Sequence, residues 1–350
     1  MNPDNQTIFL FSSCQRDLYK SDIYNALAYP SGYIMHFRYR KKWVDEQLWD
    51  ATSWNLEGKD ALVIAVLAGE DNNPKFFPIR EGRLIKILKE GDTLHIYFEL
   101  TPYWANYSNS TEDFDASIKK FPKIPQKIKG DYWGGKFISF GNHSWIDFSL
   151  DPESWNTVIE NLGKNNAFKQ GLFYRVIRLF DPSSHQAIPI TYLYESDELT
   201  KGYHLEGGKR YIFELAFDYG KEPPSAAEEN IFKIESMDLI KIMPCVKKLG
   251  FRVDTMRCSL SSEKTFWGQH TFITTKIENS IEGPYLEIPF KIERSSEAYL
   301  YGLMILSGLI LISGVLDEFV STDSQYKFII KLFGTFLSTT GTWLLTSYKR

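Results

Sequence analysis

A basic and aromatic stretch near the N-terminus is the first candidate for chemistry in the sequence. Residues 38–43 read RYRKKW, and two further arginines follow in the segment FFPIREGR. Cationic side chains bind phosphates, and interleaved aromatic rings stack on a base or hold a cation. On a strand, however, alternate residues share one face, and an ordinary solvated face has the same composition. The sequence therefore predicts either a ligand-binding surface or a solvated strand face, formed by Arg38, Arg40, Lys42, Trp43, Arg80 and Arg83.

No catalytic or metal-binding motif is recognisable. The sequence lacks a GxSxG elbow, a P-loop, an HExxH helix and a GxGxxG turn after a strand. The six histidines are scattered singly, and Cys14, Cys245 and Cys258 share no CxxC spacing. We expect no metal and no cofactor, and the odd number of cysteines suits a reducing compartment. We favour a non-enzymatic role, although a site assembled from residues distant in sequence keeps enzymatic activity open.

The elements that would position such residues are mostly strands. Apolar and aromatic residues alternate between turn signals along much of the first 294 residues, and aromatic residues make up 15% of the chain. We therefore expect a mainly β fold with two or three sandwich- or barrel-like units. The predicted divisions are an N-terminal β-rich domain at 1–103, a linker or exposed basic loop at 104–130, and a second β-rich region at 131–294 that is divisible into units at 168–244 and 250–294.

The last fifty residues have a different composition. Residues 298–316 contain no charge, and residues 328–348 contain only Lys331. Each stretch is close to the roughly 20 residues that an α-helix needs to cross the hydrocarbon core of a bilayer. The sequence therefore predicts a C-terminal two-helix transmembrane hairpin at 298–348.

The charges around this segment predict its orientation. The gap at 317–327 is acidic, whereas Lys and Arg residues flank the two apolar stretches on their outer sides. Because Lys and Arg are retained on the cytoplasmic side, we expect a two-pass protein of a bacterial inner membrane with both termini in the cytoplasm.

Small residues recur within the predicted hairpin. Such residues let two helices approach closely. They predict either packing of the hairpin against itself or assembly of subunits, through Gly302, Gly308, Gly334, Ser338 and Thr342.

Together these patterns indicate a membrane-anchored cytoplasmic sensor or adaptor whose β domains bind a protein or a small ligand. One version is an antiviral defence effector whose hairpins oligomerise and disrupt the membrane. The alternatives are a membrane-bound enzyme acting on lipid or nucleotide, and a passive anchored scaffold. The expected partners are the lipid bilayer, another protein or a second copy of the chain, and a nucleotide or nucleic acid. The net charge of −4 provides no global attraction to nucleic acid.

Overall fold

A computed structural model of the 350-residue chain gives the fold. It describes residues 6–14, 17–44, 46–50, 56–68, 73–105, 111–120, 137–142, 149–150, 154–168, 171–194, 199–221, 223, 230–265, 267–278, 283–312 and 324–347.

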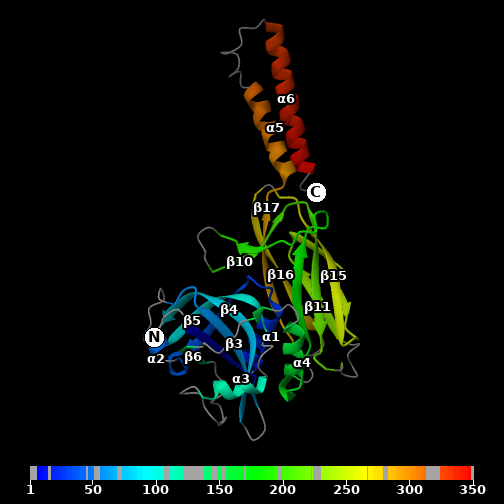
Figure 1. The fold of residues 1–350 in the computed structure, drawn as a ribbon. Coiled ribbons are helices and arrows are strands. Elements are labelled where there is room, and N and C mark those ends of the chain that lie inside the picture. The colour runs from blue at the N-terminus through cyan, green and yellow to red at the C-terminus, as the bar shows by residue number, and fades with distance from the viewer. Residues whose placement is uncertain are drawn as a thin grey trace.

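The N-terminal part is built around one mixed sheet (Figure 1). In order across the sheet, its strands are β2 (Ile34–Arg40), β5 (Thr93–Ala105), β4 (Pro74–Glu90), β3 (Asp60–Ala68), β1 (Gln6–Ser13) and β6 (Phe137–Asn142), with β7 (Ser149–Leu150) paired to β5. The β1–β3 pair is parallel and the other pairs are antiparallel.

Helices cover both faces of this sheet, which is why its central strands are apolar on both sides. One face packs against α1 (Asp17–Ala28) and belongs to the main core. On the other face, Phe9 and Leu62 join a smaller core with Phe114 of α3 (Thr111–Ile118). A short helix, α2 (Glu46–Asp50), follows the 3-10 turn at Lys41–Trp43.

The second β region consists of two sheets. The six-stranded sheet contains, in order, β14 (Val246–Lys248), β12 (Ile231–Ser236), β16 (Gln269–Glu278), β17 (Leu286–Glu293), β10 (Lys201–Glu206) and β9 (Ile190–Tyr192). The four-stranded sheet contains β13 (Ile240–Met243), β15 (Val253–Ser262), β11 (Arg210–Asp218) and β8 (Phe173–Phe180). Alternate residues of these strands are buried, as in β17, so that apolar side chains of both sheets join the main core.

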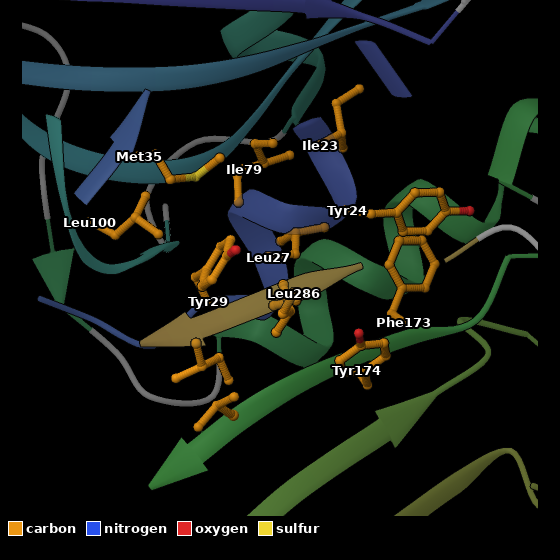
Figure 2. Packing of buried hydrophobic residues seen from close by; sticks show 14 of the residues in the cluster. Ile23, Tyr24, Leu27, Tyr29, Met35, Ile79, Leu100, Phe173, Tyr174 and Leu286 are labelled. Carbon is orange, nitrogen blue, oxygen red and sulfur yellow. The ribbon is translucent and has the colours of Figure 1, made fainter. Parts of the chain in front are cut away.

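The N-terminal part and the second β region share that core. Figure 2 shows Tyr24 and Leu27 of α1 beside Phe173 of β8 and Leu286 of β17, and the ring centroids of Tyr24 and Phe173 are 5.1 Å apart. The backbone N–H of Glu287 also donates to the hydroxyl of Tyr29 over 3.1 Å. Helix α4 (Ser154–Gly163) also contacts α1. The indole N–H of its Trp155 donates to the carbonyl of Leu27 over 3.2 Å.

The expectation of a mainly β protein is confirmed. The proposed domain divisions stay predictions. Much of the 104–130 segment, including Lys123, Lys127 and Lys129 of its basic stretch, lies outside the described residues.

The predicted transmembrane hairpin is wrong. Within the described ranges, no helix combines the length and the apolar content that a membrane span requires. In the described residues, helix α5 (Ser296–Ile312) covers 17 residues, whereas a span needs roughly 20. Helix α6 (Ser324–Ser347) has 24 residues, but Lys327, Lys331 and several Ser and Thr residues interrupt its apolar sequence. The two-pass inner-membrane location with cytoplasmic termini depended on these spans and is corrected with them.

Candidate functional site

The basic strand of the N-terminal sheet has one buried and one exposed face. In β2 the side chains of Phe37 and Tyr39 enter the main core, and His36, Arg38 and Arg40 alternate with them on the exposed side. β2 is the end strand in the described order of the sheet and pairs with β5. The two arginines therefore lie on an accessible edge of the sheet.

Strand β5 adds two rings to this exposed face. The cross-strand register places His36 opposite Tyr97 and Arg38 opposite His95. The rings of His36 and Tyr97 are stacked, with centroids 4.4 Å apart and an interplanar angle of 7°. The ring of His95 lies 5.1 Å from that of His36, at 11°. We call His36, His95 and Tyr97 the ring stack.

A hydrogen bond and a nearby carboxylate accompany the two imidazoles of the ring stack. His36 Nε2 lies 3.0 Å from His95 Nδ1, and His95 Nε2 lies 3.5 Å from Glu90 Oε2. His36 Nε2 and His95 Nδ1 share one hydrogen bond, so one ring donates to the other. The two imidazoles are thereby held next to each other beside Arg38.

The other predicted ligand-binding residues fall into three groups. Lys42 and Trp43 follow β2 directly, and the Lys42 ammonium lies 4.9 Å from the Trp43 ring centroid. Arg83 is exposed on β4, where its guanidinium lies against Gly58. Arg80 is separate from both, because its side chain is buried.

Arg80 has a structural role in this position. It is 0% exposed, its Nε donates to the carbonyl of Thr101 over 2.6 Å, and its Nη1 donates to the carbonyls of Ala26 and Tyr29 over 3.2 Å each. Nη2 donates to Ser31 Oγ over 3.1 Å. Ala26 lies in the last turn of α1, where backbone carbonyls lack helical partners and a positive charge is favourable. Arg80 thus donates hydrogen bonds to backbone carbonyls at the end of α1 and does not present its charge to a ligand.

Sequence reasoning missed the ring stack. Alternation alone places His36 on the same side as Arg38, and His95 on the same side as Tyr97. Nothing in the local sequence shows that these two strands pair or in which register, so the contact between the rings could not be inferred.

A buried carboxyl group lies elsewhere on the sheet. Glu81 of β4 is 7% exposed, and its Oε1 has no hydrogen-bond partner. The pKa of Glu81 is raised to about 8, chiefly by burial and also by the nearby charge of Asp60, whereas Arg80 opposes the shift. Along β4, Glu81 is five residues from Lys86, the partner of Tyr97, or roughly 17 Å at about 3.4 Å per residue. It is too distant to contact a small group held at the ring stack.

A second polar cluster lies on the six-stranded sheet. His204 Nδ1 and the Lys291 ammonium each lie 3.1 Å from a Glu293 oxygen, and His204 Nε2 lies 2.9 Å from the carbonyl of Tyr192. The ring of Tyr194 stacks on His270 at 4.2 Å, and burial together with the charge of Lys291 lowers the pKa of His270. Because these groups are bonded to one another, the cluster is best explained as a bridge between neighbouring strands.

Metal binding has no visible basis in the part of the chain described here. No three His, Cys, Asp or Glu side chains in those residues are grouped so as to hold a metal ion.

The small residues of the C-terminal helices lie where α5 and α6 meet. A Cβ at Gly308 would lie 2.6 Å from the carbonyl oxygen of Gly334 and 2.6 Å from the amide nitrogen of Ser338. Gly302 is half-buried on α5. Thr342 is exposed and donates its hydroxyl to the carbonyl of Ser338 over 2.8 Å. The closest contacts of this face are therefore between the two helices of one chain.

Comparisons with known proteins add little to this geometry. No protein-family model matches the sequence, and no curated protein matches it. Among solved structures, the chain is similar to a Bacteroides ovatus GH5 xyloglucanase in complex with a XXXG heptasaccharide, with 13% identity and a TM-score of 0.18. The likeness covers 31% of this chain and 19% of that one, so the match spans about a fifth of the enzyme. At this TM-score it supports no conclusion about fold or function.

Proposed function

We propose that this chain is a binding protein that holds a phosphorylated ligand with a planar ring, such as a nucleotide, on the exposed face of β2 and β5. The observation that carries this proposal is the ring stack of His36, His95 and Tyr97 beside the exposed Arg38 and Arg40. This function is a form of the sensor or adaptor expected from the sequence, with its ligand class specified.

The two arginines supply the phosphate-binding part. A guanidinium donates several hydrogen bonds in a planar fork that matches the oxygens of a phosphate. Arg38 and Arg40 are two residues apart on one strand, so their Cα atoms are about 7 Å apart and both can reach one polyphosphate. Lys42 follows on the same edge and adds to the positive charge.

The ring stack supplies the part that holds a base. Tyr97 is stacked on one side by His36, and a planar ligand that stacks on an aromatic ring gains about 1–3 kcal/mol. The Tyr97 hydroxyl belongs to the same cluster of rings, and a hydroxyl can donate to or accept from polar atoms of a base.

The test is a binding titration with the full-length protein. We expect a nucleoside triphosphate to bind more tightly than inorganic phosphate in isothermal titration calorimetry, because only the nucleotide uses both the arginines and the rings. A short single-stranded oligonucleotide in the same assay distinguishes a nucleotide site from a site for a polymer.

Variants locate the site. Arg38→Ala combined with Arg40→Ala should weaken nucleotide binding about tenfold or more, equivalent to about 1.4 kcal/mol. Arg210→Ala removes an exposed arginine from the four-stranded sheet and serves as the matched control. Equal nucleotide affinity in the double variant, the control and the wild type would refute the proposed site.

A further inference from the structure

Two arginines lie on either side of one glutamate on the four-stranded sheet. The register places Glu214 of β11 opposite Arg178 of β8 and opposite Arg257 of β15. Arg178 Nε donates to Glu214 Oε2 over 2.6 Å, and Arg257 Nε forms an ion pair with Glu214 Oε1. We call Arg178 and Arg257 the arginine pair.

The arginine pair is on a surface that is separate from the ring stack. In Figure 1, β11 and β15 lie to the right of the N-terminal sheet, in the second β region. Side chains such as Phe213 and Leu260 point from these strands into the main core, whereas Arg257 alternates with buried residues on the exposed side. A ligand bound here would therefore not compete with one bound on β2 and β5.

Contacts within the chain hold the arginine pair in place. Glu214 is 6% exposed, and each of its two oxygens contacts one guanidinium. The guanidinium carbon of Arg178 also lies 4.5 Å from the ring centroid of Phe180, which is a cation–π contact. Because these contacts already restrict two long side chains, ligand binding here loses less side-chain entropy than binding at unrestrained arginines.

The arginine pair nevertheless remains accessible. The side chains of Arg178 and Arg257 are 45% and 73% exposed. Both contact Glu214 through Nε, and within the described ranges their Nη groups make no hydrogen bond to any other residue. The flanking residues of β11 on this face, Ile212 and Ala216, are uncharged. The Nη groups can therefore donate to an external acceptor.

The charge of this group favours an anion. Although burial opposes the shift, the hydrogen bonds and charges of the arginine pair lower the pKa of Glu214, so its carboxylate is ionised at neutral pH. One carboxylate between two guanidiniums leaves one positive charge without a counter-charge in the group. A phosphate monoester carries about −1.5 to −2 charges at pH 7 and would supply the missing negative charge.

The spacing of the two guanidiniums fits one phosphate group. Each Nε lies within hydrogen-bonding distance of one Glu214 oxygen, so the two Nε atoms are at most roughly 8 Å apart. Two oxygens of one phosphate, each accepting over about 2.8 Å, join donors that are up to roughly 8 Å apart. The planar fork of a guanidinium also matches the oxygens of a phosphate. One phosphate can therefore accept from both arginines at once.

We infer that the arginine pair is a phosphate-binding site on the second β region. Glu214 holds both guanidiniums from the buried side and leaves their Nη groups for the ligand. A soluble phosphate compound and a lipid headgroup offer the same chemical group, and the test separates these two sources. The inference is independent of the proposed nucleotide site, which lies on another sheet.

The test uses the full-length protein with Arg38→Ala and Arg40→Ala already in place, so that the proposed nucleotide site does not contribute. We expect inorganic phosphate to bind this parent protein in isothermal titration calorimetry. Arg178→Lys combined with Arg257→Lys should raise the dissociation constant for phosphate at least about tenfold, because lysine lacks the planar fork. Lysine keeps the charge beside Glu214, so the variant should keep the circular dichroism spectrum of the parent. Arg257→Lys alone, at the more exposed position, should raise the dissociation constant by a smaller factor.

A matched control makes the same chemical change elsewhere on this β region. Arg210 and Arg252 are exposed, and Arg210 is four residues from Glu214 along β11, or about 14 Å. That distance exceeds the Debye length of about 8 Å at physiological ionic strength. Arg210→Lys combined with Arg252→Lys should therefore leave the affinity for phosphate unchanged.

Co-flotation with vesicles identifies the source of the phosphate. Flotation with phosphatidylcholine vesicles that contain phosphatidic acid, lost in the Arg178 and Arg257 variant, would support a lipid headgroup. Phosphate binding without flotation would support a soluble phosphate compound, and equal flotation with pure phosphatidylcholine would count against the headgroup.

Two results would overturn the inference. One is a parent protein that binds neither inorganic phosphate nor the phosphatidic acid vesicles. The other is equal binding by the parent, the control and the variant with lysine at positions 178 and 257. Neither result would affect the proposed nucleotide site, because that site is tested separately through Arg38 and Arg40.

Discussion

The N-terminal sheet and the C-terminal hairpin depart from the usual distribution of residues in opposite directions. The sheet buries the ionisable groups of Arg80 and Glu81, whereas the hairpin exposes leucines and phenylalanines. Arg80 has four hydrogen bonds to compensate its burial. In the residues that the structure describes, these apolar side chains of α5 and α6 stay about half or more exposed. A buried charge that is hydrogen-bonded within the chain, such as Arg80, indicates a structural role, whereas exposed apolar side chains on neighbouring turns of a helix are typical of contact surfaces.

The largest loss of stability should come from replacing Arg80. Arg80→Ala would leave the carbonyls of Thr101, Ala26 and Tyr29 without their donor in a buried place. We expect a loss of about 3–5 kcal/mol in the free energy of unfolding, measured by urea denaturation. Arg40→Ala removes an exposed arginine and should change that free energy by less than about 0.5 kcal/mol. Similar losses in the two variants would show that the hydrogen bonds of Arg80 contribute little.

Replacing Glu81 should change the free energy of unfolding by a smaller amount, and this change should depend on pH. Its pKa is about 8 in the folded protein against an ordinary 4.5, so the folded state binds the proton more tightly. Its contribution to stability is present below pH 4.5 and is lost as the pH rises towards 8. Glu81→Gln should therefore stabilise the protein increasingly over this range, by on the order of 3 kcal/mol at pH 7.

Urea denaturation at pH 5 and pH 8 measures the effect of Glu81. The difference between Glu81→Gln and the wild type should be larger at pH 8. An unchanged difference at the two pH values would contradict a raised pKa.

A bulky side chain at the contact between α5 and α6 should destabilise the hairpin moderately. Gly308→Leu would force a side chain against the backbone of Gly334 and Ser338, where even a Cβ is too close. We expect a loss of about 1–3 kcal/mol in hairpin stability, seen as faster limited proteolysis of the C-terminal helices. Ser307→Leu, at the exposed neighbouring position, should leave the cleavage rate unchanged. Equal rates in both variants would mean that α5 and α6 do not meet at Gly308.

The ring stack should give the smallest effect on stability. His36→Ala removes the ring that contacts both Tyr97 and His95, and such a pair contributes about 1 kcal/mol beyond its buried area. If the stack serves ligand binding, the same change should reduce the free energy of nucleotide binding by more than it reduces the free energy of unfolding measured in urea. A large loss of stability with unchanged binding would assign the stack to the fold alone.

The sequence alone determined the local features of this protein. Alternation of apolar and polar residues predicted the mainly β fold, and it predicted that Arg38 and Arg40 share one strand face, which the structure shows to be exposed. Length and apolar content predicted helices near the C-terminus. The same content suggested membrane spans, although α5 is short and α6 is interrupted by polar residues. These features depend on neighbours within one strand or helix, and so their periodicity is visible in the sequence.

Only the tertiary structure decided which of these residues meet. Arg80 and Arg83 have the same charge and lie three positions apart, yet Arg80 is buried at the end of α1 and Arg83 is exposed. His36 and His95 are 59 residues apart and share a hydrogen bond because β2 and β5 pair in one register. Gly308 meets Gly334 because α5 and α6 fold back on each other. Each contact joins distant parts of the chain, and a shift of one residue in pairing would have turned these side chains to the opposite face.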